Sequence, residues 1–191
     1  MDSSFPLSRY VSQLRRYIPV DVFGGCGDLR CPLDGTGNVF STCDDHLERH
    51  YRFYLSFENS LCTDYITEKF WRLLDRDVLP VTLGAGDYLK HVPQGTYVDV
   101  RDFRSPRHLA DYLWTLIRRD DLYAAYLERK RRLRCTSSRS NDFATKLCYH
   151  LFLNAEHREM TDLSGRWNLT KACQTPKEFY RGIAEAIDMK K

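Results

Sequence analysis

The sequence predicts an α/β domain built on a Rossmann-like parallel sheet with helices on both faces. Short apolar runs rich in β-branched and aromatic residues recur along the chain, and segments with apolar side chains at helical spacing separate them. Turns rich in glycine, proline and aspartate divide the two kinds of segment. Strands that alternate with helices favour a parallel sheet, and 191 residues suffice to bury one such core.

The first predicted unit is a helix over residues 9–17 followed by a short strand over residues 20–23. Apolar side chains recur at helical spacing in the helix, and Pro19 ends it. Two consecutive glycines close the strand. Residues 26–50 contain glycine, proline, aspartate, threonine and cysteine without periodicity, so we predict a long loop there.

The central predicted unit is a strand over residues 51–57 that leads through a polar elbow into a helix. The strand alternates large apolar side chains with smaller or polar ones and stops at residues 58–60. A helical pattern begins at Tyr65, and the side chain of Thr63 or Asp64 is placed to cap it by accepting a backbone N–H.

Such an elbow is where open α/β sheets bind ligands, because the following helix offers free N–H groups and the positive end of its dipole. An anionic ligand is therefore expected. Lys69 adds a positive charge suited to a phosphate. Asn59, Tyr65 and Glu68 carry groups that hydrogen-bond hydroxyls or a base. The alternative is that the acidic and basic side chains of this segment merely pair with one another on a solvated helix face.

Two further strands are predicted, over residues 78–83 and 97–100. The first is a continuous apolar run of the buried parallel kind. Pro80 argues that this strand lies near an edge or a bulge, because proline lacks the N–H that a ladder requires. Four helices are predicted beyond these strands. The first begins at Ser105, and the others cover residues 121–133, 143–152 and 176–189.

Charge and hydropathy exclude several classes of protein. A net charge of +3 is far from the concentrated basic surface of a nucleic-acid-binding protein, and no nucleic-acid partner is expected. The basic cluster of residues 128–134 keeps an apolar stripe, which favours a solvated helix face over a phosphate site. No run of about eighteen apolar residues occurs, and the first residues lack the pattern of a signal peptide.

Seven cysteines indicate an oxidising compartment, and none forms a Cys-x-x-Cys pair. We expect one disulfide within an N-terminal group and another within a C-terminal group. The two groups are Cys26, Cys31 and Cys43, and Cys135, Cys148 and Cys173. A zinc site near His46 and His50 is a disfavoured alternative, because the cysteine spacing is wrong for it. The sequon at Asn168 is a weak further sign of a lumenal chain.

The central unit resembles a known family. The runs Phe53-Tyr-Leu-Ser-Phe-Glu-Asn-Ser60 and Asp64-Tyr-Ile-Thr-Glu-Lys-Phe-Trp71 are similar to the donor-binding signature of the α1,3-fucosyltransferases, which are Golgi enzymes. The similarity continues through residues 78–84 and 98–106 and covers roughly residues 9–135.

The resemblance implies the C-terminal half of a GT-B glycosyltransferase. It implies a GDP-fucose-binding domain over residues 1–135 and a helical extension over residues 136–191 packed on the same domain. Lys69 matches the lysine at the diphosphate, and Glu68 matches the acid that hydrogen-bonds sugar hydroxyls. Asn59 and Tyr65 match donor-contacting positions. GDP-fucose is then the donor substrate, with no tightly bound cofactor and no obligatory metal.

The resemblance also defines what this chain is expected to lack. In the family the N-terminal half binds the glycan acceptor and carries the general base, and an N-terminal membrane anchor holds the enzyme in the Golgi with its catalytic part in the lumen. The family usually has an arginine for the donor phosphates where this chain has Leu7, and Arg9 is the nearest basic residue. Glu58 is the nearest carboxylate to the elbow, and holding that elbow is its favoured role.

Three interpretations follow from the sequence. The chain is the donor half of an α1,3-fucosyltransferase that transfers fucose with inversion to a GlcNAc of a glycan. Alternatively, it is a catalytically silent module that binds a nucleotide sugar, or a cytosolic α/β protein with a coincidental similarity. Core N-glycan and N-acetyllactosamine acceptors both stay open.

Overall fold

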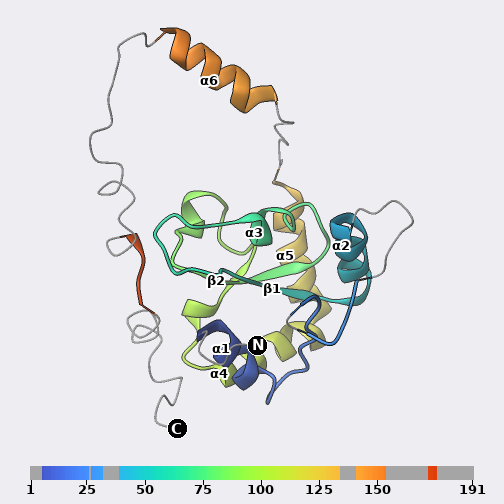
Figure 1. Ribbon diagram of the computed structural model, residues 1–191. Helices are drawn as coiled ribbons and strands as arrows, with labels where there is room; N and C mark the ends of the chain where they lie inside the picture. Colours follow the sequence, from blue (N-terminus) through green and yellow to red (C-terminus); the bar gives the residue numbers. More distant parts are fainter. Residues whose placement is uncertain (1–5, 26, 32–38, 134–140, 154–171, 176–191) are drawn as a thin grey trace.

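The computed structural model describes residues 6–25, 27–31, 39–133, 141–153 and 172–175. Within these ranges three parallel strands form one sheet in the order β1-β2-β3 (Figure 1). The strands are β1 (Phe53–Phe57), β2 (Leu79–Leu83) and β3 (Val98–Asp99). The helices are α1 (Pro6–Leu14), α2 (Val39–His50), α3 (Glu68–Trp71), α4 (Pro106–Arg118), α5 (Asp120–Arg131) and α6 (Asn141–Leu153).

The strands share one direction, so they end at one edge of the sheet. β1 and β2 pair along their whole lengths, from Phe53 opposite Leu79 to Phe57 opposite Leu83. β3 pairs with β2 over two residues, beginning opposite Val81. The loops after the three strands therefore converge at the carboxyl edge of the sheet, which is the ligand-binding edge of open α/β folds.

Helices cover both faces of the sheet, as the sequence predicts. Alternate side chains of β1, from Phe53 to Phe57, join the larger core with apolar residues of α1 and α4, which lie together on one face (Figure 1). On the opposite face the hydroxyl of Ser56 donates to the backbone carbonyl of Lys69 at 2.9 Å, so α3 lies there. A smaller aromatic core packs around α3 and contains Phe70, Leu74, Tyr88, Val92 and Tyr97.

A buried lysine joins α5 to the turns between α3 and β2. The Lys130 ammonium donates to the carbonyls of Leu73 at 2.7 Å and Val78 at 2.5 Å, and also to that of Arg76. Burial lowers the pKa of Lys130 to about 8. The lysine thus satisfies carbonyl groups at the point where the chain enters β2.

Helix α2 corrects the prediction of a loop over residues 26–50. Its acidic side chains pair with basic residues that follow α3, with Asp44 3.2 Å from Arg72 and Glu48 3.1 Å from Arg76. These partners lie more than twenty residues further along the chain, so the local sequence does not show the pairs that hold the helix. The helix also buries Leu47, so ion pairs and an apolar contact together hold it in place.

Of two short predicted strands, the structure lacks one and shortens the other. Residues 20–23 form only an isolated bridge at Phe23, so the prediction of a strand there is wrong. The strand predicted over residues 97–100 ends at Asp99, whose carboxylate accepts from the backbone N–H of Arg101 at 2.8 Å. This side-chain bond turns the chain out of the sheet.

Pro80 lies in the central strand, so its predicted position near an edge or a bulge is also wrong. The preceding N–H, that of Leu79, donates to the carbonyl of Arg52 beside β1 at 2.8 Å. The ring nitrogen of Pro80 therefore faces the β3 side, where pairing begins only at Val81. Proline is tolerated because no ladder bond is required at that point.

Two disulfides lie among the described residues. Cys31 pairs with Cys43, which confirms the disulfide expected in the N-terminal group. Cys173 pairs with Cys62 and not with another cysteine of its own group, so the second expectation is wrong. Cys148 on α6 carries an exposed free thiol. Since the sulfurs of Cys31 and Cys43 are joined, they are not zinc ligands.

The Cys62–Cys173 disulfide attaches a C-terminal segment to the elbow after β1. The N–H of Thr63 donates to the carbonyl of Ala172 at 2.7 Å, and the N–H of Gln174 donates to the carbonyl of Leu61 at 2.8 Å. These bonds flank the disulfide on both sides. The elbow therefore has a covalent and a hydrogen-bonded partner far along the chain.

The C-terminal predictions are tested only in part. Helix α6 confirms the helix predicted over residues 143–152, and its side chains are exposed wherever they are described. Cys26, Cys135, Asn168 and the helix predicted over 176–189 lie outside the described residues. No helix in the described ranges combines the length and the apolar character that a membrane span requires.

Candidate nucleotide-sugar site at the carboxyl edge

The carboxyl edge gathers residues from the loops after all three strands. Glu58 and Asn59 follow β1, Gly84 follows β2, and Arg101 follows β3. A Cβ atom at Gly84 would lie 3.1 Å from Cγ of Glu58, so the two loops are in close contact. The Arg101 guanidinium binds both carboxylate oxygens of Asp99, at 3.0 and 2.6 Å. This bidentate pair fixes the end of β3.

The fully buried carboxylate of Glu58 holds the elbow. One oxygen accepts from the backbone N–H of Thr67 at 2.8 Å, and the other accepts from the Thr67 hydroxyl at 2.7 Å. This confirms the favoured role of Glu58. Helix α3 begins at Glu68, so the helix starts later than predicted and neither Thr63 nor Asp64 caps it. Thr67 has an extended backbone, with φ of −103° and ψ of −175°, so the helix begins only after it.

The Lys69 ammonium lies beside this carboxylate at the start of α3. Its Nζ is 3.2 Å from the Thr67 hydroxyl oxygen, 3.2 Å from Oε1 of Glu68 and 4.0 Å from Oε2 of Glu58. The Lys69 side chain is 25% exposed, whereas that of Glu68 is 70% exposed. The hydrogen bond from Lys69 lowers the pKa of Glu68. A partly exposed cation therefore lies at the edge where an anionic ligand is expected.

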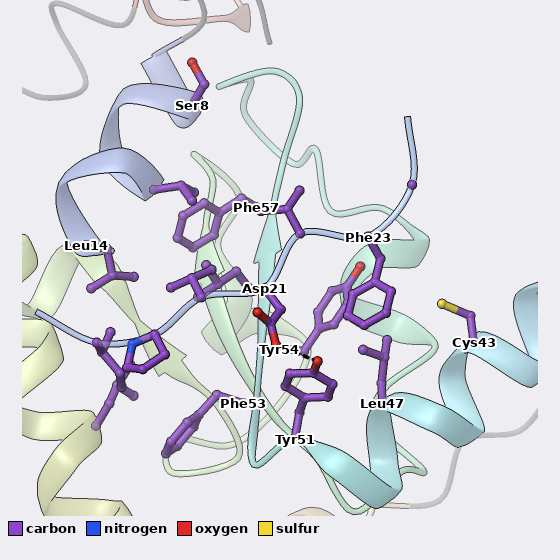
Figure 2. A pocket seen from close by; sticks show the side chains of 18 of the residues that line it. Ser8, Leu14, Asp21, Phe23, Cys43, Leu47, Tyr51, Phe53, Tyr54 and Phe57 are labelled. Atoms are coloured by element: carbon purple, nitrogen blue, oxygen red, sulfur yellow. Dashed lines mark hydrogen bonds between the residues drawn. The ribbon is translucent and has the colours of Figure 1, made fainter. Parts of the chain in front are cut away.

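A large apolar cavity of about 910 Å³ lies along β1, and Asn59 at the carboxyl end of that strand is part of its lining (Figure 2). Side chains from both faces of β1 line it, among them Phe53, Tyr54 and Phe57, so it follows the strand's edge and not one face of the sheet. Among the described residues β1 pairs only with β2. The long side of β1 that faces away from β2 is therefore open to the cavity. Asn59 and Arg72 add polar groups to the lining.

The structure distributes the predicted donor residues over two places. Glu68 and Lys69 lie together at the start of α3, while Asn59 lines the cavity. Tyr65 is half-buried in the loop between them. Arg9 is half-buried on α1, next to Ser8, which lines the same cavity as Asn59. Contact of these residues with a donor stays a prediction.

Sequence reasoning missed two features of this site. Thr67 bonds both Glu58 and Lys69, and its place directly before the Glu68-Lys69 pair was the available signal. The second feature is Arg72, which donates to the Tyr54 hydroxyl at 2.6 Å. Burial raises the pKa of Asp44, its ion-pair partner. No local signal identified that cluster, because its members come from β1, α2 and the turn after α3.

A parallel sheet with helices on both faces and polar loops at its carboxyl edge is a Rossmann-like arrangement, and each half of a GT-B glycosyltransferase has this kind of fold. A solved α1,3-fucosyltransferase with GDP shares this fold, with a TM-score of 0.58 and 20% identity over 80% of this chain and 44% of that one. The family model described as glycosyltransferase family 10 (fucosyltransferase), C-terminal part, matches residues 4–167. The chain belongs to this family.

Curated relatives carry two kinds of name. The glycoprotein 3-alpha-L-fucosyltransferase A of Drosophila melanogaster is 42% identical over 125 residues, which are 64% of this chain and 24% of the relative. The human GDP-fucose protein O-fucosyltransferase 3 is 39% identical over 125 residues, which are 63% of this chain and 26% of the relative. The chain thus spans about a quarter of the length of either relative.

Proposed function

We propose that this chain is the donor-binding half of an α1,3-fucosyltransferase and that it binds GDP-fucose at the carboxyl edge of its sheet. Family membership and the shared fold support the class of reaction. The observation that carries the proposal is Lys69, whose side chain is 25% exposed at that edge. A cation there would interact with the diphosphate of the donor.

The proposed reaction breaks the bond between the fucose anomeric carbon and the β-phosphate oxygen of GDP. Negative charge builds on that phosphate as the bond breaks, and a fixed cation stabilises the charge more in the transition state than in the ground state. An acceptor hydroxyl attacks the opposite side of the anomeric carbon, which inverts its configuration. Lys69 is the residue that we assign to the leaving diphosphate.

Attack by the hydroxyl also requires a general base within hydrogen-bond reach. Glu58 is fully buried and both of its oxygens bond Thr67, so it is not a candidate for that role. We therefore assign the base and the acceptor site to the acceptor-binding half that the family resemblance implies. We propose a GlcNAc of a glycan as the acceptor, and the choice between core N-glycan and lactosamine chains rests with that other half.

A second candidate function is nucleotide-sugar binding without transfer. It is favoured by Leu7, which stands where the resemblance calls for an arginine at the donor phosphates. An assay of fucose transfer to an N-glycan acceptor distinguishes the two functions. Transfer supports the enzyme, and donor binding without transfer supports the silent module.

We propose the Golgi lumen as the compartment. The disulfides Cys31–Cys43 and Cys62–Cys173 support an oxidising environment, since cytosolic chains rarely keep such bonds. The membrane anchor that the family resemblance implies belongs to the same proposal. Mass spectrometry of the native protein tests the compartment, because fully reduced thiols would contradict it.

Calorimetric titration with GDP, GDP-fucose and GDP-mannose tests donor binding. Lys69→Ala is expected to weaken GDP binding by about 1.5–3 kcal/mol, because a charge-assisted contact to phosphate is lost. Lys90→Ala is the matched control, since Lys90 is an exposed lysine paired with Asp87 on another turn. The proposal includes no obligatory metal, so EDTA should leave GDP binding unchanged. Wild-type protein that binds no guanine nucleotide would overturn the proposal.

A further inference from the structure

We propose that Glu58 and Thr67 are positioning residues that orient the Lys69 ammonium toward the donor diphosphate. The inference rests on the proposed function and deepens it. A relay of two hydrogen bonds carries it, from Lys69 Nζ to the Thr67 hydroxyl at 3.2 Å and from that hydroxyl to Oε2 of Glu58 at 2.7 Å.

The direction of these bonds follows from the chemistry of the three groups. A carboxylate only accepts and an ammonium only donates, whereas a hydroxyl donates one hydrogen and accepts through its lone pairs. The Thr67 hydrogen therefore points to Glu58, and a lone pair of the same oxygen faces Lys69. Glu58 fixes the orientation of the hydroxyl, and the hydroxyl in turn fixes the ammonium.

The surroundings keep Glu58 in place. Its side chain is fully buried, and its other oxygen accepts from the Thr67 backbone N–H at 2.8 Å. Gly84 lies against it so closely that an added Cβ would be 3.1 Å from Cγ of Glu58. A buried carboxylate also requires a nearby cation, and Lys69 Nζ at 4.0 Å supplies one. The carboxylate is thus unable to follow the lysine if the lysine moves.

The arrangement leaves part of the ammonium for a ligand. Lys69 Nζ carries three hydrogens, and its bonds to Thr67 and Glu68 use two of them. Glu68 is 70% exposed, so the acidic partner on that side is solvated, while Thr67 is held by two bonds to Glu58. A diphosphate that approaches from solvent would meet the third hydrogen without displacing the buried relay.

An isosteric change separates positioning from packing. In Glu58→Gln the amide oxygen must accept from the Thr67 N–H, which leaves the NH₂ group facing the Thr67 hydroxyl. That hydroxyl then accepts from the amide, and its own hydrogen no longer has the carboxylate acceptor that fixed it, so the lone pair facing Lys69 is no longer held in one orientation. Thr67→Val removes the hydroxyl and keeps the side-chain shape, whereas Thr67→Ser retains the hydroxyl.

The experiment measures affinity for GDP and GMP by calorimetry in the 191-residue chain and these three variants. Because GMP lacks the β-phosphate, we expect Glu58→Gln and Thr67→Val to lower the GDP-to-GMP affinity ratio about tenfold or more, and Thr67→Ser to restore it. In a Lys69→Ala background Thr67→Val should have no further effect. Thr115→Val on α4 is the control, since its hydroxyl bonds only its own helix at 2.9 Å.

The outcomes distinguish this inference from the proposed function. An unchanged ratio in Thr67→Val, with a lowered ratio in Lys69→Ala, overturns the positioning role and keeps the donor site. An equal loss of GDP and GMP binding also overturns it, because that pattern reports a general structural effect. Wild-type protein without any GDP binding overturns the proposed function itself. If Glu58→Gln fails to fold, the comparison of Thr67→Val with Thr67→Ser decides the matter.

Discussion

Burial of Lys130 makes the stability of this fold depend on pH in a predictable direction. The side chain is 1% exposed, and burial lowers its pKa from the ordinary 10.5 to about 8. Between these two values the unfolded chain holds a proton that the folded chain has released. The free energy of unfolding rises with pH wherever the unfolded state binds more protons, so the folded protein gains stability as the pH rises through this window.

The size of the effect follows from the two pKa values. From about pH 7 to about pH 9.5 the lysine should add about 2 kcal/mol to the free energy of unfolding. In Lys130→Met the side chain has a similar volume but does not titrate, so the free energy of unfolding lacks this pH dependence. Near pH 9.5 the neutral amine still donates to carbonyls such as those of Arg76 and Val78, so the methionine variant should be about 2–4 kcal/mol less stable there. Near pH 7 the difference should be about 2 kcal/mol smaller.

Urea unfolding followed by tryptophan fluorescence at several pH values measures this difference. The control is Lys90→Met, because Lys90 is exposed and its variant should follow the wild-type curve. Stability curves of wild type and Lys130→Met that stay parallel from about pH 7 to about pH 9.5 would refute the reasoning. A gap that narrows with rising pH would show that the carbonyl bonds stabilise the charged form more than burial destabilises it.

Three further changes test other parts of the structure. Cys62→Ser should destabilise the fold by about 3–4 kcal/mol in urea unfolding, because the bond to Cys173 closes a separation of 111 residues, and unchanged stability would contradict that bond. Ser105→Ala removes an oxygen that accepts a hydrogen bond from a backbone N–H of α4 at 3.0 Å, so Tm should fall by about 2–4 °C. An unchanged Tm would show that the cap is dispensable. Gly86→Ala places a Cβ 2.5 Å from Ile66, so the free energy of unfolding should fall by about 1–3 kcal/mol and GDP binding should weaken. Normal GDP binding would place this loop outside the donor site.

Strands β1 and β2 and the helices α4, α5 and α6 could be predicted because their signals are local. β1 and β2 were predicted within two residues of their observed starts, since apolar runs bounded by polar elbows are typical of buried strands. Helix α4 combines an N-cap serine, a proline at its first position and apolar side chains on one face, all visible in the sequence. The Lys69 region was identified by its place after a strand and by its resemblance to a family.

The missed features depend on residues that are distant in the sequence. Helix α2 is held by ion pairs to Arg72 and Arg76, which lie outside the sequence segment around α2. The partner of Cys62 lies 111 residues away, and spacing alone does not select it from the other cysteines. Thr67 was overlooked because its role requires knowledge of where the buried Glu58 carboxylate points. Local pattern thus located the candidate site, and only the tertiary arrangement showed how its parts connect.

The link between Cys62 and Cys173 also decides what proteolysis would do to this protein. A single cut of the chain between Leu133 and Ala172 would leave the C-terminal piece attached through sulfur to the loop after β1. The nicked protein would migrate as one band on a denaturing gel without reductant and as two bands with it. Cleavage in this region would therefore divide the chain without releasing its C-terminal tail.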